Sequence, residues 1–211
     1  MIITLSGLPG AGKSTIKDLL AERLNLKKYS MGDMRGEMAK SRGLTIDELN
    51  DIGLTDASTD KQVDEFQTTL GKEQDNFIID GAMSWYFIPQ SLKIFLKADP
   101  KVAAERIFKD RQNNPHRSDE PEYRSVDDTQ QALAARAAHN NARYQKWYGA
   151  NYLDEANYDL VIDTTHMALE DVLEKILDFV RTQQPWPLSW LQLYSGSMFF
   201  ELSLWPMQSK L

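Results

Sequence analysis

The chain has 211 residues, of which 42% are hydrophobic, a length and composition that suit one α/β domain with a small lid. Its formal net charge of −7 argues against a general nucleic-acid-binding surface, which needs a basic face. The lack of cysteine excludes disulfide bonds and thiolate zinc sites, and it fits a cytoplasmic protein. The three histidines, His116, His139 and His166, are scattered along the chain and do not indicate a metal site.

The first fifteen residues are the most informative segment of the chain. Ile2 to Leu5 form a short apolar run, as expected of a buried strand, and this run is too short to predict a secretory signal. Gly7 to Ser14 then match G-x-x-x-x-G-K-[ST], the phosphate-binding loop. A helical pattern follows over residues 14–24, so the motif stands between a strand and a helix, the setting in which it binds nucleotide phosphates.

The residue types of this loop suit a triphosphate. Glycines let the backbone curl so that its N–H groups point at the phosphates, and the dipole of the next helix adds to the same anion site. We expect Lys13 to place its charge on the β- and γ-phosphates and Ser14 to bind Mg²⁺. The alternative is a glycine-rich turn that holds no ligand. The predicted ATP-binding residues are Gly7, Leu8, Pro9, Gly10, Ala11, Gly12, Lys13, Ser14 and Thr15.

Strand and helix patterns alternate along the rest of the chain. Further strands are predicted at residues 26–29, 77–79, 91–96 and 158–163. Helices are predicted at residues 33–41, from a capping box at 45–48, and at 61–70, 100–111, 126–148 and 169–181, with turns at 53–60. This order predicts a three-layer α/β/α fold with a doubly wound, five-stranded parallel sheet.

A polar, proline-containing segment without periodicity covers residues 112–123. Since water would compete with the acceptor in phosphoryl transfer, we expect this segment to be a mobile lid over residues 112–124. The predicted domain covers residues 1–184. The remaining residues, 185–211, form an apolar tail that contains Trp186, Trp190 and Trp205. The alternatives for this tail are packing on the domain, pairing with a second copy and contact with a membrane interface, and a monomer or homodimer is expected.

Charged residues of two kinds point to phosphoryl transfer. Asp80 ends an apolar strand, where an aspartate of phosphate-loop proteins holds Mg²⁺ through water; the alternative is an ordinary turn aspartate beside Gly81. The chain also gathers Arg106, Arg111, Arg117, Arg124, Arg136 and Arg143, whose planar forks suit phosphates, although a solvated charged helix is the alternative. The predicted catalytic residues are Lys13, Arg111, Arg124, Arg136 and Arg143.

The chain resembles the nucleoside monophosphate kinases, and most closely the archaeal-type cytidylate kinases, over about residues 1–180. The residues that carry the resemblance are Gly7–Thr15, Tyr29-Ser30-Met31-Gly32-Asp33, Glu37-Met38-Ala39, Arg42-Gly43-Leu44, Asp80-Gly81, Ala104-Glu105-Arg106-Ile107, Arg143-Tyr144, Tyr148-Gly149 and Tyr158–Thr164. Arg124, Asp127, Asp128 and Arg136 also resemble the stretch after the lid of adenylate kinases.

This resemblance implies an adenylate kinase-like phosphate-loop fold and phosphoryl transfer from ATP with Mg²⁺. It implies a pyrimidine monophosphate acceptor, CMP or dCMP, held around residues 30–37, with small nucleotides as the partners. The acceptor-binding residues are then Ser30, Gly32, Asp33, Arg35, Asp80 and Gly81, and the metal-binding residues are Ser14 and Asp80.

Two departures from the family pattern fall on the acceptor side. The family usually has an arginine where this chain has Gly36, one residue after Arg35, and often another where it has Ala82. A kinase for AMP, UMP or another small acceptor is therefore the first alternative. A non-catalytic nucleotide-binding module is the second, which the absence of the guanine signature Asn-Lys-x-Asp disfavours. Aromatic residues 85–87 are expected to pack in the core, or else to stack on a base.

Overall fold

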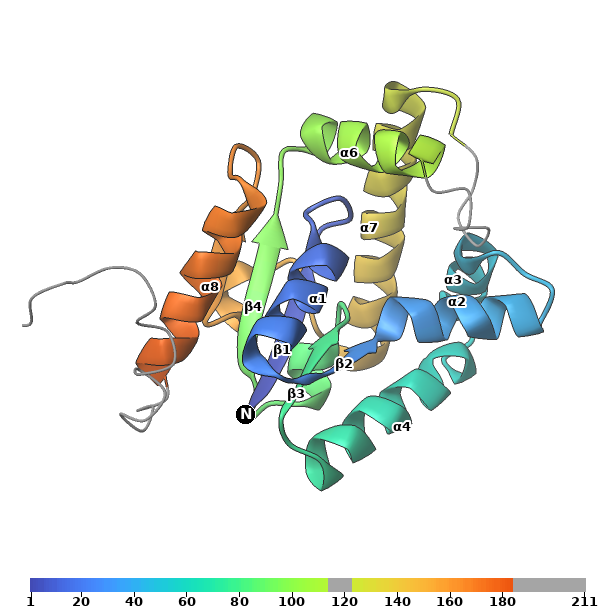
Figure 1. Ribbon diagram of the computed structural model, residues 1–211. Helices are drawn as coiled ribbons and strands as arrows, with labels where there is room; N and C mark the ends of the chain where they lie inside the picture. Colours follow the sequence, from blue (N-terminus) through green and yellow to red (C-terminus); the bar gives the residue numbers. More distant parts are fainter. Residues whose placement is uncertain (114–122, 184–211) are drawn as a thin grey trace, which may run out of the picture.

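The computed structural model describes residues 1–113 and 123–183 and contains a five-stranded parallel sheet with helices on both faces, as predicted (Figure 1). The strand order is β2-β3-β1-β4-β5, and every neighbouring pair is parallel. The strands are β1 (Ile2–Gly7), β2 (Lys27–Ser30), β3 (Phe77–Asp80), β4 (Leu92–Lys97) and β5 (Leu160–Asp163).

Apart from the short α5, the helices lie close to the predicted ranges. They are α1 (Lys13–Leu24), α2 (Met31–Ser41), α3 (Ile46–Gly53), α4 (Ser58–Glu73), α5 (Ser84–Phe87), α6 (Pro100–Asn113), α7 (Val126–Tyr148) and α8 (Leu169–Gln183). Helix α4 begins three residues before the expected Lys61, so part of the predicted turn at 53–60 is helical. Most of the expected lid, with Arg117, and the tail from residue 184 lie outside the described residues.

Side-chain caps set the starts of the helices around the site. The Ser30 hydroxyl accepts a hydrogen bond from the Asp33 amide at 3.2 Å and begins α2. Thr45 and Glu48 form the predicted capping box of α3, and the Ser125 hydroxyl accepts a bond from the Asp128 amide at the start of α7. Local sequence therefore places these three helices.

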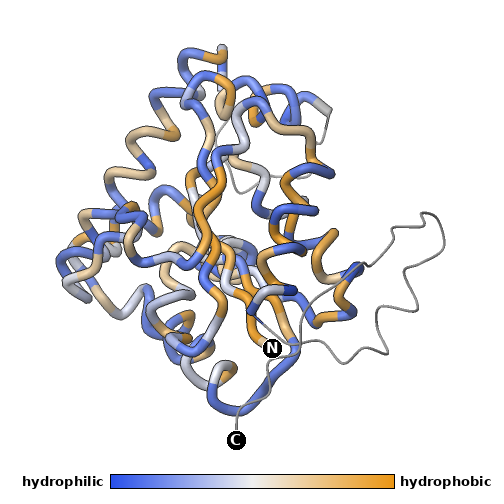
Figure 2. Tube along the Cα trace, turned by 90° about the vertical axis from the view of Figure 1, so that its left-hand side faces the viewer, coloured by the Kyte–Doolittle hydropathy of each residue, from blue (hydrophilic) through white to orange (hydrophobic). Residues whose placement is uncertain are grey.

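The core is divided by the sheet into two layers, because successive residues of a strand point to opposite faces. Ile78 packs with α1 and α8 on one face, whereas Phe77 and Ile79 pack with α2, α3 and α4 on the other. Figure 2 shows the hydrophobic strands running through the middle of the molecule between the helices. A third cluster joins α5 to α7 through aromatic side chains.

The carboxyl ends of the strands bring the predicted site residues to one edge of the sheet. Asp80 lies in register with Leu5 on one side and with Ser30 on the other. This edge of an open α/β sheet is where ligands bind in such folds. Among the helices of the described ranges, none has both the length and the apolar composition needed to span a bilayer.

Candidate active site

The phosphate loop between β1 and α1 has the left-handed backbone that its glycines permit. Gly7, Gly10 and Gly12 have φ angles of 145°, 77° and 89°. A Cβ atom on Gly7 would lie 2.0 Å from the Leu96 carbonyl oxygen, and one on Gly10 would lie 2.7 Å from that of Ala103. The loop therefore packs directly against β4 and α6, and this packing restricts the conformation of its backbone.

Arg106 of α6 braces this loop from behind. Its guanidinium donates to the Thr164 carbonyl oxygen at 2.8 Å and to the Thr164 hydroxyl at 3.1 Å. The same hydroxyl lies 3.2 Å from the Ala11 carbonyl oxygen and donates to it. Arg106 thus ties the loop to the end of β5, and this arginine positions the backbone.

Lys13 lies inside the loop, with its Nζ atom donating to the Leu8 carbonyl oxygen at 2.7 Å. Burial lowers the pKa of Lys13 to about 8, while nearby Asp80 raises it and Arg136 lowers it. The ammonium is therefore charged at neutral pH, and a bound triphosphate would favour that charge further. Ser14 and Thr15 are exposed at the start of α1.

Asp80 has a partner that the sequence did not predict. Its Oδ1 atom accepts a hydrogen bond at 2.8 Å from Nζ of Lys17, one turn after Lys13 on α1, and both side chains are buried. Lys17 lies on the buried face of α1, otherwise apolar, where a charge is tolerated only if it is paired. The second Asp80 oxygen has no hydrogen bond among the described residues.

The residues at this edge fit a magnesium ion that is held mainly by nucleotide phosphates and water. Mg²⁺ in such sites takes one or two protein oxygens, and Ser14 and Asp80 supply that number. In residues 1–113 and 123–183 no group of three or more His, Asp or Glu side chains is placed to hold a metal by itself.

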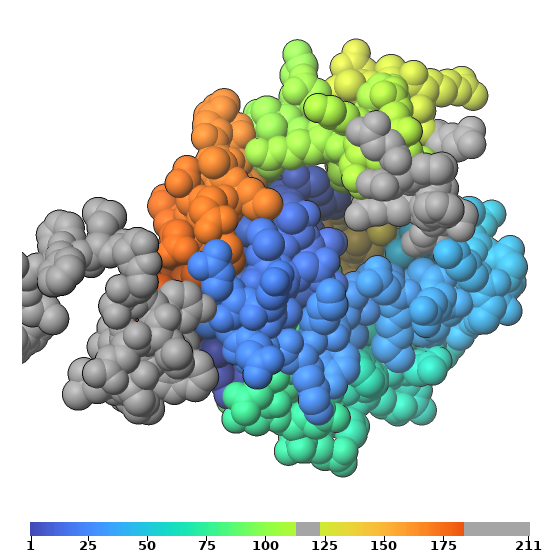
Figure 3. Space-filling model, in the orientation of Figure 1, coloured from blue at the N-terminus to red at the C-terminus, as the bar shows by residue number. Residues whose placement is uncertain are grey.

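A cavity of about 150 Å³ opens beside the loop. In Figure 3 the surface is hollowed between α6 and α2, and α7 lies at the bottom of the hollow. The cavity lining includes Lys13, Gly32, Arg35, Asp60, Asp64, Gln67, Asp80, Gly81, Arg136, Asn140, Arg143 and Tyr144. A larger hollow of about 390 Å³ lies at the opposite edge of the sheet, near Met1, and contains none of the predicted site residues.

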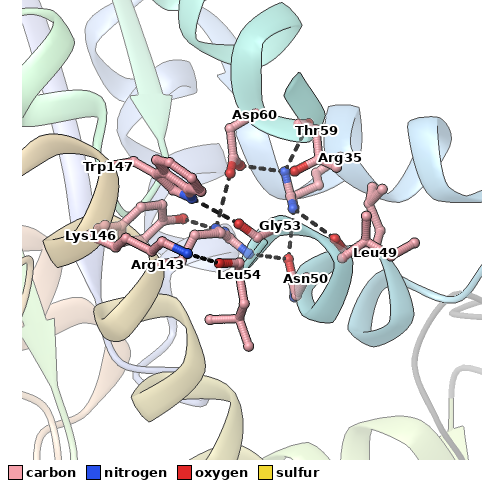
Figure 4. A network of polar contacts seen from close by, with 12 residues as sticks. Arg35, Leu49, Asn50, Gly53, Leu54, Thr59, Asp60, Arg143, Lys146 and Trp147 are labelled. Atoms are coloured by element: carbon pink, nitrogen blue, oxygen red, sulfur yellow. Dashed lines mark hydrogen bonds and ion pairs between the residues drawn. The ribbon is translucent and has the colours of Figure 1, made fainter. Parts of the chain in front are cut away.

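A buried polar network forms one wall of this cavity (Figure 4). Arg35 of α2 donates to Asp60 of α4, with 2.5 Å between Nη1 and Oδ1, and to Asn50 of α3 at 2.7 Å. Arg143 of α7, which is fully buried, lies 3.1 Å from the other Asp60 oxygen and donates to Asn50 at 2.9 Å. Trp147 of α7 adds a bond from its indole N–H to the Gly53 carbonyl oxygen at 2.9 Å. The network thus fastens four helices together.

This network changes the interpretation of two predicted residues. Arg35 was expected to bind the acceptor and Arg143 to act in catalysis, yet both guanidinium groups are occupied by Asp60 and Asn50. A buried carboxylate requires such partners, and one carboxylate between two guanidinium groups leaves the network with a net positive charge. Both residues also line the cavity, so their roles in acceptor binding and catalysis stay predictions beside the positioning that these contacts provide.

Some of the other predicted site residues line the cavity, and others lie outside it. Arg136 lines the cavity near Lys13, and one Nε–carboxylate contact of 3.9 Å links it to Asp47. Arg124 is exposed, and the Arg111 guanidinium carbon lies 5.9 Å from the centre of the Tyr123 ring. Gly32 and Gly81 line the cavity, whereas Ser30 and Asp33 cap α2 beside it.

Trp85 and Phe87 pack against a core cluster, as the first of the two expectations has it, whereas Tyr86 is 42% exposed. The Trp85 ring lies 5.8 Å from the Tyr158 ring, and the Phe87 ring lies 5.5 Å from that of Tyr148. None of the three lines the cavity. A base in the cavity would instead meet Tyr144 and the side chains of α4.

Two cavity residues of α4 were missed by the sequence analysis. Burial raises the pKa of the Asp64 carboxyl to about 6, although a hydrogen bond donated by the Tyr148 hydroxyl opposes this rise. Gln67 is buried, with its Oε1 atom accepting a bond from the Ser84 hydroxyl at 2.7 Å. The sequence pattern that could have revealed them is the spacing of residues 60, 64 and 67, which places their polar side chains on one face of a helix.

Comparison with known proteins agrees with this geometry. The model of the cytidylate kinase-like family matches residues 2–166. The chain belongs to this family. A protein named cytidylate kinase from Methanococcoides burtonii is 33% identical and covers 84% of this chain and 97% of its own length. Another of that name, from Methanocella arvoryzae, is 34% identical over 78% of this chain and 88% of its own.

As a member of the cytidylate kinase-like family, the chain is an enzyme of the nucleotide kinase class. Its fold is also similar to that of shikimate kinase from Acinetobacter baumannii, solved in complex with shikimate. That structure has a TM-score of 0.53 and 18% identity, and it covers 87% of this chain and 94% of its own. At this identity the likeness describes the fold alone.

Asp64→Asn should stabilise the protein at neutral pH but not in acid. Because the pKa of Asp64 is about 6 in the folded state and 3.8 ordinarily, its ionisation disfavours folding, and stability falls as pH rises from about 4 to 6. Asparagine removes this charge and still accepts a bond from Tyr148. We expect a higher Tm than wild type at pH 7.5 and an equal Tm at pH 4. Asp18→Asn, on the exposed face of α1, is the control, and a lower Tm of Asp64→Asn at pH 7.5 would contradict the argument.

Proposed function

We propose that this chain transfers the γ-phosphoryl group of ATP to a nucleoside monophosphate, with CMP or dCMP as the preferred acceptor and CDP or dCDP as the product. The observation that carries the proposal is that one cavity joins the phosphate loop to a separate polar wall on α4 and α7. The loop is suited to the phosphates of the donor, and the wall is suited to a second, smaller ligand. The names of the related proteins favour cytidine nucleotides.

The reaction needs no protein nucleophile, because an acceptor phosphate oxygen attacks the γ-phosphorus directly. The protein contributes positioning and charge. Backbone N–H groups of the loop hold the donor phosphates, and the cations of Lys13 and Arg136 stabilise the charge on the transferring group. Mg²⁺, when held by Ser14 and Asp80, would neutralise charge on the phosphate oxygens.

Lys17 has a supporting role in this proposal. With its ammonium on one Asp80 oxygen, the carboxylate is held in place at the lining of the cavity. The carboxylate then needs no rearrangement when the donor arrives. Arg35 and Arg143 act in a similar way on the acceptor side, by holding α2, α3, α4 and α7 in one arrangement.

The test is the rate of ADP formation from ATP and Mg²⁺ with CMP, dCMP, UMP, AMP or GMP, each against a control without acceptor. We expect kcat/KM to be highest for CMP or dCMP, since the polar wall suits a small base with a donor and an acceptor. A higher value for AMP or UMP would move the acceptor assignment to that nucleotide. ATP binding without any acceptor-dependent ADP would favour the non-catalytic module.

A further inference from the structure

We propose that Asp64 and Gln67 of α4 recognise the base of the acceptor nucleotide and select cytosine over uracil. This inference rests on the proposed function, because it assigns the residues that choose the acceptor in that same cavity. It adds two residues to the site and gives each a defined partner on the base.

The cavity has two ends with separate sets of charges. Lys13 is influenced by Asp80 and Arg136, which mark the end where phosphates bind. Asp64 is influenced by Asp60, Arg35 and Arg143, the charged residues of the polar network. A carboxylate would repel phosphates, so the Asp64 end suits the uncharged base.

Helix α4 presents one polar face to this second end. Asp60, Asp64 and Gln67 follow each other at intervals of one turn, and all three line the cavity. Asp60 is already neutralised by two guanidinium groups. The groups that remain for a ligand are therefore those of Asp64 and Gln67.

Hydrogen bonds fix which atoms these two side chains offer. The Tyr148 hydroxyl donates to one Asp64 oxygen, and the other has no hydrogen bond among the described residues. Ser84 donates to Oε1 of Gln67, which leaves its Nε2 amide as a donor without a partner in the described part of the chain. The Gln67 side chain is only 2% exposed, so this donor can be satisfied only from the cavity.

One acceptor beside one donor matches the hydrogen-bonding edge of cytosine. The N4 amino group of cytosine donates to a carboxylate, and its N3 atom accepts from an amide. Uracil has an acceptor at O4 and a donor at N3, so both contacts would be unfavourable. A site whose buried polar groups are left unpaired rejects the wrong ligand strongly. Adenine offers the same pair as cytosine, so this wall distinguishes cytosine from uracil and leaves rejection of adenine to the shape of the cavity.

The test is the ratio of kcat/KM for CMP to kcat/KM for UMP in wild type, Asp64→Asn and Gln67→Glu. Asparagine can turn its amide N–H₂ toward O4 of uracil, and glutamate accepts from N3–H. We expect each substitution to lower the CMP to UMP ratio by about 10- to 100-fold, the range for one correct hydrogen-bonded pair. AMP turnover should fall together with that of CMP.

Tyr148→Phe is the control, because it removes the Tyr148–Asp64 hydrogen bond and keeps the carboxylate. Its CMP to UMP ratio should stay within about threefold of wild type. If Asp64→Asn lowers CMP and UMP turnover equally, or if Tyr148→Phe changes the ratio as much, Asp64 is structural and the inference is wrong. If both α4 variants turn over at the wild-type rate and keep the wild-type CMP to UMP ratio, the inference is wrong, and the proposed function is not affected. If wild type phosphorylates no nucleoside monophosphate, the proposed function fails, and calorimetric binding of CMP and UMP to the same variants still tests the wall.

Discussion

Lys13→Ala should reduce ATP-dependent phosphoryl transfer by about 10³-fold or more, since one preorganised charge on a transferring phosphoryl group contributes this much to catalysis. We expect the variant to remain folded. Burial lowers the pKa of Lys13 to about 8, so its charge opposes folding at neutral pH, and its one hydrogen bond joins it to the Leu8 carbonyl oxygen. The measurement is steady-state kcat with saturating CMP, beside a thermal melt at pH 7.

Lys28→Ala is the matched control for this variant. Lys28 is exposed and pairs with Asp18 at 2.8 Å on the surface, where such pairs contribute little. Its kcat should equal that of wild type. Turnover by Lys13→Ala within about tenfold of wild type would refute the assignment of this loop to the donor phosphates.

Arg143→Ala should lower the free energy of unfolding by about 3–5 kcal/mol, because it removes a large, fully buried side chain together with its hydrogen bond to Asn50, although Asp60 keeps its pair with Arg35. Arg143 is fully buried and contacts Asp60 and Asn50 at 3.1 Å and 2.9 Å. For a domain of this size the loss corresponds to a Tm about 8–15 °C lower. Denaturant unfolding at pH 7 measures it directly. Arg143→Lys should recover little, since an ammonium cannot reproduce the planar fork.

Arg136→Ala provides the contrast on the same helix. Its side chain is 20% exposed, whereas Arg143 is fully buried, so its loss should cost less stability than the loss of Arg143. Its kcat, however, should fall by about 10²-fold or more, because the cation lies beside Lys13 in the cavity. If Arg136→Ala and Arg143→Ala lower the free energy of unfolding equally, Arg143 does not hold the network.

The parts of this protein that follow local rules could be predicted from its sequence. The phosphate loop, the five strands and the caps at Ser30, Thr45 and Ser125 depend on residues close in the chain, and the structure confirms the fold they imply. The short helix α5 was not predicted, because four residues carry no periodic pattern.

The polar contacts between distant helices could not be predicted in this way. The partners of Arg35 lie on α3 and α4, and the partner of Lys17 lies on β3, 63 residues away. Charge and residue type show that each buried cation needs a carboxylate, but not which one packing will bring to it. For Asp64 and Gln67 the helical spacing was visible, and only the cavity shows what that face adjoins.

The two ends of the cavity are built by different parts of the chain. The phosphate end comes from α1, β3 and α7, through Lys13, Asp80 and Arg136, and the wall with Asp64 and Gln67 comes from α4. A point mutation on α4 can therefore change the preferred acceptor while the phosphate loop stays intact. During divergence of such enzymes, a lineage could acquire a new substrate through one or two codons and remain an active catalyst at every intermediate step.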